Sequence, residues 1–254
     1  MAVARSRVSG PTPQRRISSI AGLLLAALAL VGMGHTGAPR PRVSILVIGG
    51  SAADGWLDRT HEGYVVRGLR DYARAEGVQA QIQNRAIPGA RVVNPLVQRS
   101  LGQWVRQVGP HAVVVLAWGM LNDLKRHTPT RAVLAALARQ IAVVLAHHDT
   151  VLIVTPPATR ATYQRFPQEE PRLVHLELAV AKRFDSAHLF VDNVFQAERA
   201  YLASHGLGIA AVTRGPFHPN TAGAELGGHL MARRLEHLWK VPPTAPSRPR
   251  AGQR

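Results

Sequence analysis

Cysteine is absent from this 254-residue chain. Its absence excludes disulfides, lipid-modified cysteines and thiolate metal sites, so the fold must be stabilised by packing. No internal repeat is visible either. A chain of this length can form one large domain with a proper hydrophobic core.

Acidic residues are scarce: 15 Asp and Glu stand against 31 Lys and Arg, for a formal net charge of +16. Residues 1–42 carry six arginines and no acid, and residues 240–254 carry four basic residues and no acid. Between these ends the net charge is +6. Arginine enrichment on a solvated surface explains it better than nucleic-acid binding, so no nucleic-acid partner is expected. A basic domain at an envelope surface could still approach anionic polymers or lipid headgroups.

The first 42 residues have the layout of a targeting segment. Four arginines lie between positions 5 and 16, followed by an apolar run from Ile20 to Val31 and the small residues Gly32 and Gly34. This order is typical of an export signal, so we expect an extracellular, periplasmic or envelope-associated protein. Cleavage after Gly34 would release a soluble chain, whereas the uncleaved run would be a marginal membrane anchor. Residues 240–254 are basic and rich in proline, which predicts a disordered tail.

Short apolar runs alternate with amphipathic ones, which predicts a parallel sheet covered by helices. Strands are expected at Val43–Ile48, Val78–Ile87, Ala112–Ala117, Val151–Thr155 and His188–Asp192. Helices are expected at Tyr64–Glu76, Asn94–Val108, from Thr128 onwards, Glu170–Phe184, Val194–His205 and Asn220–Trp239. The sequence thus predicts one three-layer α/β/α domain over residues 43–239.

Ser51 follows the first predicted strand and is preceded by two glycines, with a further glycine at position 55. Such glycines let the backbone turn sharply and expose a serine hydroxyl at the carboxyl edge of a parallel sheet. The serine could be a nucleophile, but glycine-rich turns at this place also cradle phosphates or are only tight turns. The segment matches neither the dinucleotide glycine pattern nor a P-loop, so we expect no cofactor.

Three further segments follow strands or precede a helix. They are Asn84–Gly89, Gly119–Asp123 and Phe217–Gly223. A serine nucleophile needs a base to accept its proton, and His218, at a helix entry, is the candidate. His147-His148-Asp149 could suggest a metal site, but adjacent residues on a helix point in different directions, so a solvated helix end is the expected explanation and no metal is expected there.

Together with the segment around Ser51, these segments resemble the GDSL-type esterase/lipase family, also called SGNH hydrolases. The resemblance covers roughly residues 43 to 239 and implies a five-stranded parallel sheet with the flavodoxin-like strand order. It implies that Ser51 is the nucleophile and His218 the base. It also implies that the backbone N–H groups of Ser51 and Gly89 and the side-chain amide of Asn122 stabilise the oxyanion. Without the resemblance, Gly89 and Asn122 would be a turn glycine and a turn or capping asparagine.

Two departures from the family pattern bear on the chemistry. One extra residue separates Gly119 from Asn122, which would shift Asn122. The family's acid lies three residues before the histidine, where this chain has Gly215. An acid fixes the histidine tautomer and stabilises the imidazolium. We prefer a Ser51–His218 dyad, next a substitute acid such as Asp192, and last a loss of activity.

The sequence therefore predicts an exported, monomeric serine esterase that forms an acyl-enzyme on Ser51. Its substrate would be a lipid or an O-acetylated carbohydrate of the cell envelope. The alternative is an inactive envelope protein that keeps the fold to bind a glycan or a protein partner. Gly215 favours that alternative, whereas Ser51, Asn122 and His218 oppose it. A nucleotide-binding domain ranks third, because the phosphate loop is missing.

Overall fold

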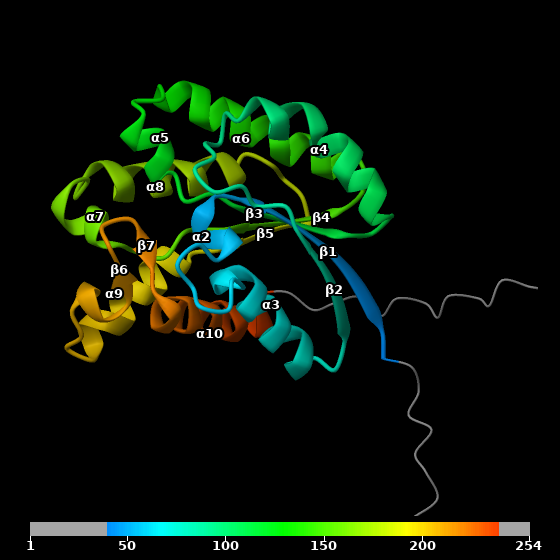
Figure 1. Ribbon diagram of the computed structural model, residues 1–254. Helices are drawn as coiled ribbons and strands as arrows, with labels where there is room; N and C mark the ends of the chain where they lie inside the picture. The colour runs from blue at the N-terminus through cyan, green and yellow to red at the C-terminus, as the bar shows by residue number, and fades with distance from the viewer. Residues whose placement is uncertain (1–39, 239–254) are drawn as a thin grey trace, which may run out of the picture. The chain divides into compact units, whose positions relative to one another are not determined.

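The computed structural model describes residues 40–238, so all but the last three residues of the predicted targeting segment, and the whole predicted tail, lie outside the described residues. A five-stranded parallel sheet forms the centre, in the order β2-β1-β3-β4-β5 (Figure 1). This order confirms the predicted flavodoxin-like arrangement. The strands are β1 (Arg42–Gly49), β2 (Gln79–Asn84), β3 (Val113–Ala117), β4 (Thr150–Val154) and β5 (Leu189–Asp192).

Helices cover both faces of the sheet, as Figure 1 shows. One face packs against α4 (Pro95–Val108), α6 (Thr130–Leu145) and α8 (Glu169–Ala181). The other face packs against α3 (Gly63–Ala75) and α10 (Thr221–Leu238), next to α9 (Val194–Ser204). The predicted three-layer α/β/α architecture is therefore confirmed.

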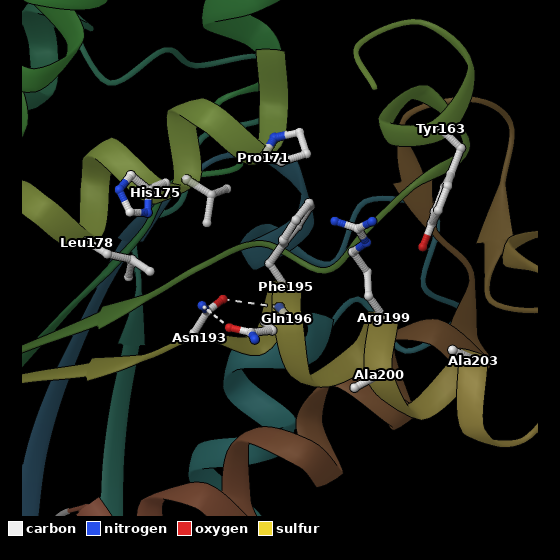
Figure 2. A pocket seen from close by; sticks show the side chains of 11 residues that line it. Tyr163, Pro171, His175, Leu178, Asn193, Phe195, Gln196, Arg199, Ala200 and Ala203 are labelled. Carbon is white, nitrogen blue, oxygen red and sulfur yellow. Dashed lines mark hydrogen bonds between the residues drawn. The ribbon is translucent and has the colours of Figure 1, made fainter. Parts of the chain in front are cut away.

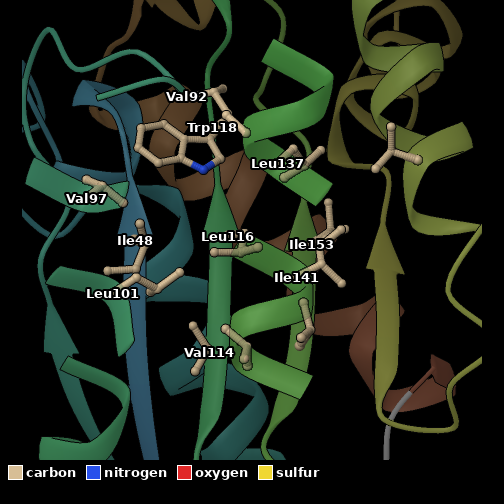
Figure 3. Close-up of a cluster of buried hydrophobic side chains, with 14 of the residues drawn as sticks. Ile48, Val92, Val97, Leu101, Val114, Leu116, Trp118, Leu137, Ile141 and Ile153 are labelled. Carbon is tan, nitrogen blue, oxygen red and sulfur yellow. The ribbon is translucent and has the colours of Figure 1, made fainter. Parts of the chain in front are cut away.

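Alternation along β1 divides the buried side chains between two cores. Leu46 and Ile48 point to the α4/α6 side, and Ile45 and Val47 point to the α3/α10 side. Because every second residue of a strand faces the same way, a strand with apolar residues at all positions must be covered on both faces. Figure 3 shows the first core, where Trp118 packs among the side chains of β1, β3, β4, α4 and α6.

The second predicted strand is corrected at its end. It stops at Asn84 instead of Ile87, because the Asn84 side chain redirects the chain. Its Oδ1 accepts a hydrogen bond from the backbone N–H of Ala86, and its Nδ2 donates to the carbonyl of Ala53. An asparagine that bonds to the backbone two residues later forms a turn.

Several short elements were not predicted from the sequence. They are α2 (Ser51–Asp54), α5 (Leu121–Lys125), α7 (Arg160–Gln164), the 3-10 helix η1 (Ile209–Ala211), and the antiparallel hairpin β6 (Thr213–Arg214) and β7 (His218–Pro219). All of them follow the carboxyl ends of the sheet strands or precede α10, so they lie where ligands bind in open α/β sheets.

Candidate active site

Ser51 begins α2 and is separated from the end of β1 by Gly50 alone. The turn between these elements needs Gly49, because a Cβ there would overlap the backbone carbonyl of Ala117 at the end of β3. Gly49 thus lets β1 and β3 approach closely while the chain reverses into α2. The side chain of Ser51 is left partly exposed at the carboxyl edge of the sheet.

The hydroxyl of Ser51 meets the ring of His218. Ser51 Oγ lies 3.0 Å from His218 Nε2, which is hydrogen-bond distance. His218 begins β7, where it pairs with Arg214 across the hairpin. The hairpin is anchored to α7, because the carbonyl of Pro216 accepts a hydrogen bond from the N–H of Ala161 at 2.7 Å.

The surroundings of His218 favour its neutral form over the imidazolium. Burial lowers the pKa of its imidazole below the ordinary value, and the nearby Lys125 ammonium lowers it further. A neutral imidazole can accept a proton, as a general base must. The same surroundings disfavour the imidazolium that forms when it does so.

No carboxylate contacts His218 among the residues that the structure describes. Asp192 is not a substitute acid: its Oδ1 accepts a hydrogen bond from Arg234 Nε at 2.6 Å, and its Oδ2 has no partner. Glu198 is also engaged elsewhere, since its Oε2 accepts from the N–H of Ala158 at 2.6 Å. The hypothesis that Asp192 replaces the missing acid is therefore wrong in this geometry.

Gly215 lies in the exposed loop of the β6-β7 hairpin, with φ at +64°. Residues with a side chain rarely adopt this left-handed conformation, although Asp and Asn tolerate it better than most. A Cβ at Gly215 would meet open space, so backbone strain and not crowding limits what can replace it.

Asn122 reaches the site despite the extra residue before it. A tight turn, in which the N–H of Leu121 donates to the carbonyl of Gly119, absorbs the insertion. Met120, at the centre of this turn, has φ +43° and is buried in the core, so packing holds its strained backbone in place. Asn122 Nδ2 donates to the carbonyl of Ala90 at 3.0 Å and has a second proton to offer.

Gly89 is placed less favourably than the other predicted residues. It is exposed at φ +75°, and it is not among the residues that line the cavity beside Ser51. Its neighbours are tied to α5 instead: the carbonyl of Ala90 accepts from Asn122, and the N–H of Val92 donates to Asp123 Oδ2 at 3.0 Å.

A cavity of about 70 Å³ lies between Ser51 and His218 and the loops after β3 and β4. The sequence did not single out several of its lining residues, namely Lys125, Pro156, Pro157 and Thr159. Pro156 and Pro157 follow β4 just as Ser51 follows β1, so their place at the carboxyl edge was available from the strand pattern. Lys125 depends on the short helix α5, which has no periodic signal.

A larger cavity, of about 610 Å³, lies among α7, α8 and α9 and shares no lining residue with the cavity at Ser51. Figure 2 shows its lining, with Arg199 between two aromatic rings. The Arg199 guanidinium lies 5.6 Å from the ring centroid of Tyr163 and 5.4 Å from that of Phe195. Asn193 and Gln196 hydrogen-bond to each other at its edge (Figure 2).

Neither a metal-binding cluster nor a membrane-spanning helix is present in the described part of the chain. Between residues 40 and 238, no cluster of three or more His, Asp or Glu side chains is arranged to hold a metal ion. No helix in that range is both long and apolar enough to cross a membrane.

A three-layer α/β/α domain with a serine hydroxyl against a histidine ring at the carboxyl ends of its strands has the architecture of a serine hydrolase. The sequence matches the GDSL-like Lipase/Acylhydrolase family over residues 47–226. The chain therefore belongs to this family and is a carboxylic ester hydrolase. No curated protein sequence matches it significantly.

Solved structures show the same fold at low sequence identity. A lipase/acylhydrolase from Enterococcus faecalis is 24% identical, with a TM-score of 0.58, over 80% of this chain and 99% of that one. An acetylxylan esterase from Geobacillus stearothermophilus is 17% identical, with a TM-score of 0.60, over 76% and 93%. The protein YxiM from Bacillus subtilis is 17% identical, with a TM-score of 0.60, over 78% of this chain and only 57% of its own length.

Proposed function

We propose that this chain hydrolyses a carboxylic ester through an acyl-enzyme on Ser51, with His218 as the general base. The observation that carries the proposal is the 3.0 Å contact between Ser51 Oγ and His218 Nε2. As Oγ attacks the ester carbonyl, Nε2 accepts the hydroxyl proton and then gives it to the departing alcohol. Water, activated by the same nitrogen, hydrolyses the acyl-enzyme.

The negative charge on the carbonyl oxygen needs donors that are already in place. Asn122 lines the cavity with Ser51, and its amide has a proton that the Ala90 carbonyl does not use. The backbone N–H of Ser51, at the first position of α2, is the second donor in this proposal. One such donor is worth about 3 kcal/mol to the transition state.

We infer a dyad, since no carboxylate contacts His218 among the described residues. The free space near Ser51, about 70 Å³, favours a short acyl group such as acetyl. We further propose that the chain is exported and acts on an O-acyl group of a lipid or an envelope carbohydrate. The layout of residues 1–42 and the acetylxylan esterase among its structural neighbours support this choice.

The test is to react purified protein with a fluorophosphonate and to map the labelled residue, in parallel with hydrolysis of 4-nitrophenyl acetate. Only an activated serine reacts, and no knowledge of the natural substrate is needed. We expect Ser51 to be labelled and Ser51→Ala to lose on the order of 10⁶-fold in rate. Ser100→Ala, in α4, is the matched control. Ser51→Ala activity within tenfold of the unmodified chain would reject the assignment and favour the inactive glycan- or protein-binding alternative.

A further inference from the structure

Two cations lie near the aromatic ring of Phe217, which precedes the proposed base His218 in the chain. Lys125 Nζ lies 5.1 Å from the ring centroid of Phe217, the residue before His218. The Arg165 guanidinium lies 5.7 Å from the same centroid. Lys125 ends α5 and Arg165 follows α7, so two separate elements bring positive charge to one aromatic ring.

Neither cation has an acidic partner in the part of the chain that the structure describes. No ion pair joins Lys125 or Arg165 to an acid in residues 40–238, whereas arginines on α3 and α10 do pair with acids. The residues that line the cavity at Ser51 include Lys125 and no carboxylate. Both cations have exposed side chains, so an incoming anion can reach them.

We infer that the ester substrate carries an anionic group, a carboxylate or a phosphate, which binds between Lys125 and Arg165 at the edge of the Phe217 ring. The inference rests on the proposed function and names the substrate class for that same site. Arginine binds either anion through two parallel N–H groups, and lysine adds a second positive charge. Phe217 supplies an apolar surface next to them for the body of the substrate.

An anion at this place would also assist the chemistry. Attack by Ser51 makes His218 positive, and Lys125 is the charged group that opposes this step. A substrate anion beside Lys125 offsets the repulsion between Lys125 and the imidazolium, because two opposite charges in contact leave little net field at the imidazole. The substrate would thus supply part of the negative charge that the missing acid provides elsewhere in the family.

The test compares three acetate esters that differ only in the group opposite the ester: 4-acetoxybenzoate, 4-acetoxyphenyl phosphate and the neutral 4-acetoxybenzamide. For each ester, kcat/KM of Lys125→Met and of Arg165→Gln is divided by that of the unmodified chain, so the intrinsic reactivity of the ester cancels. We expect each variant to lose about fivefold more on the anionic esters than on the amide, which corresponds to one partly exposed ion pair. The ester with the larger selective loss identifies carboxylate or phosphate as the preferred anion.

Two control variants test whether the selective loss on anionic esters is specific to Lys125 and Arg165. Lys182→Met removes the same charge at the end of α8 and should leave all three ratios near one. Arg199→Gln removes the cation of the larger cavity, and a selective loss there but not in Lys125→Met would overturn the inference. Salt at 1 M should reduce the preference of the unmodified chain for the anions, because it screens exposed charges.

Failure of the inference is distinguishable from failure of the proposed function. If the amide is hydrolysed and Ser51 is labelled, but Lys125→Met and Arg165→Gln lose equally on all three esters, only the anionic substrate class is wrong. If Ser51 is not labelled and no ester is hydrolysed, the proposed function fails and the inference fails with it. As a measurement without turnover, 4-hydroxybenzoate should slow fluorophosphonate labelling of the unmodified chain more than that of Lys125→Met.

Discussion

Ser51 and His218 lie 167 positions apart in the chain, and the proposed reaction needs both the hydroxyl as nucleophile and the imidazole as base. Their contact depends on two local backbone features: the Gly49 turn at the end of β1 and the short hairpin that carries His218. What the pair lacks is a negative charge. Burial and Lys125 both destabilise the protonated form of His218, and no carboxylate among the described residues stabilises it. A proton-accepting base is therefore present, but the product of proton transfer is poorly stabilised.

The variant Gly215→Asp tests whether a nearby carboxylate would stabilise the imidazolium of His218. A carboxylate three residues before His218 should stabilise the imidazolium and raise kcat for a neutral ester. The gain should stay well below the roughly 10⁴-fold loss seen when a triad aspartate becomes asparagine, because part of that loss is a tautomer effect. The positive φ of Gly215, +64°, should cost stability of about 1 kcal/mol. Rates are compared at equal folded fraction with Gly215→Asn, which carries the same backbone cost without the charge. Equal rates for the two variants would show that the carboxylate does not reach His218.

Asn122→Ala should lower kcat for short esters by about 10²-fold with little change in KM, because an oxyanion donor acts mainly in the transition state. The variant also removes the donor to the Ala90 carbonyl, so its unfolding midpoint is measured alongside. Asp123→Asn, which disturbs the same loop through Val92, is the structural control and should keep most of its activity. An equal fall in kcat in both variants would mean that Asn122 only positions the loop.

Among the elements, α8 and α9 carry buried acids that an amphipathic pattern would assign to the solvent. Glu170 and Glu177 on α8 and Glu198 on α9 are all fully buried. Burial raises the pKa of Glu170 to about 7 and that of Glu198 to about 8. A protonated carboxyl group suits such surroundings, since desolvation penalises only the charged form.

Glu198→Gln should therefore flatten the dependence of stability on pH. With a folded-state pKa of about 8 against an ordinary 4.5, the folded protein binds a proton that the unfolded chain releases, so stability falls as pH rises between these values. The glutamine removes this loss and can still accept from the N–H of Ala158. At pH 8 we expect the variant to be more stable by at least about 1 kcal/mol, the energy of one pKa unit being about 1.4 kcal/mol. Urea unfolding at pH 5 and pH 8 measures this, and an unchanged pH slope would show that Glu198 does not titrate between them.

The long elements were predictable because each buries a periodic or continuous apolar face. The alternation of short apolar runs such as that of β1 with amphipathic runs predicted a parallel sheet covered by helices, and the strand order followed from the family resemblance. The short elements gave no such signal: α2 has four residues and α5 has five, so tertiary contacts hold them. Ser51 was identified from its flanking glycines, His218 from its place at a helix entry and from the family resemblance, and Asn122 from that resemblance. Lys125 and Arg165 were not, since their position depends on how α5 and α7 fold back on the His218 hairpin.

At the scale of the whole molecule, the sheet defines where the domain begins. Pro41 already takes part in it, because its carbonyl accepts a hydrogen bond from the N–H of Gln79 at 2.8 Å, and β1 starts at Arg42. The last described helix, α10, packs extensively on α3 and contributes Met231 and Leu235 to the second core. Residues 40–238 thus contain both cores and the proposed active site.

A chain that starts at Arg40 should consequently fold and keep the activity of the full-length protein, if residues 1–39 serve export as their sequence indicates. We expect the same thermal midpoint, the same kcat/KM on 4-nitrophenyl acetate and better solubility, because the apolar run from Ile20 to Val31 is removed. In cells, the full-length chain should be found outside the cytoplasm and the shortened chain inside it. A separate truncation after Leu238 tests the basic C-terminal residues in the same way. Aggregation or a lower midpoint in the first truncation would show that residues 1–39 belong to the folded structure, and equal distribution of both chains in cell fractions would remove the case for export.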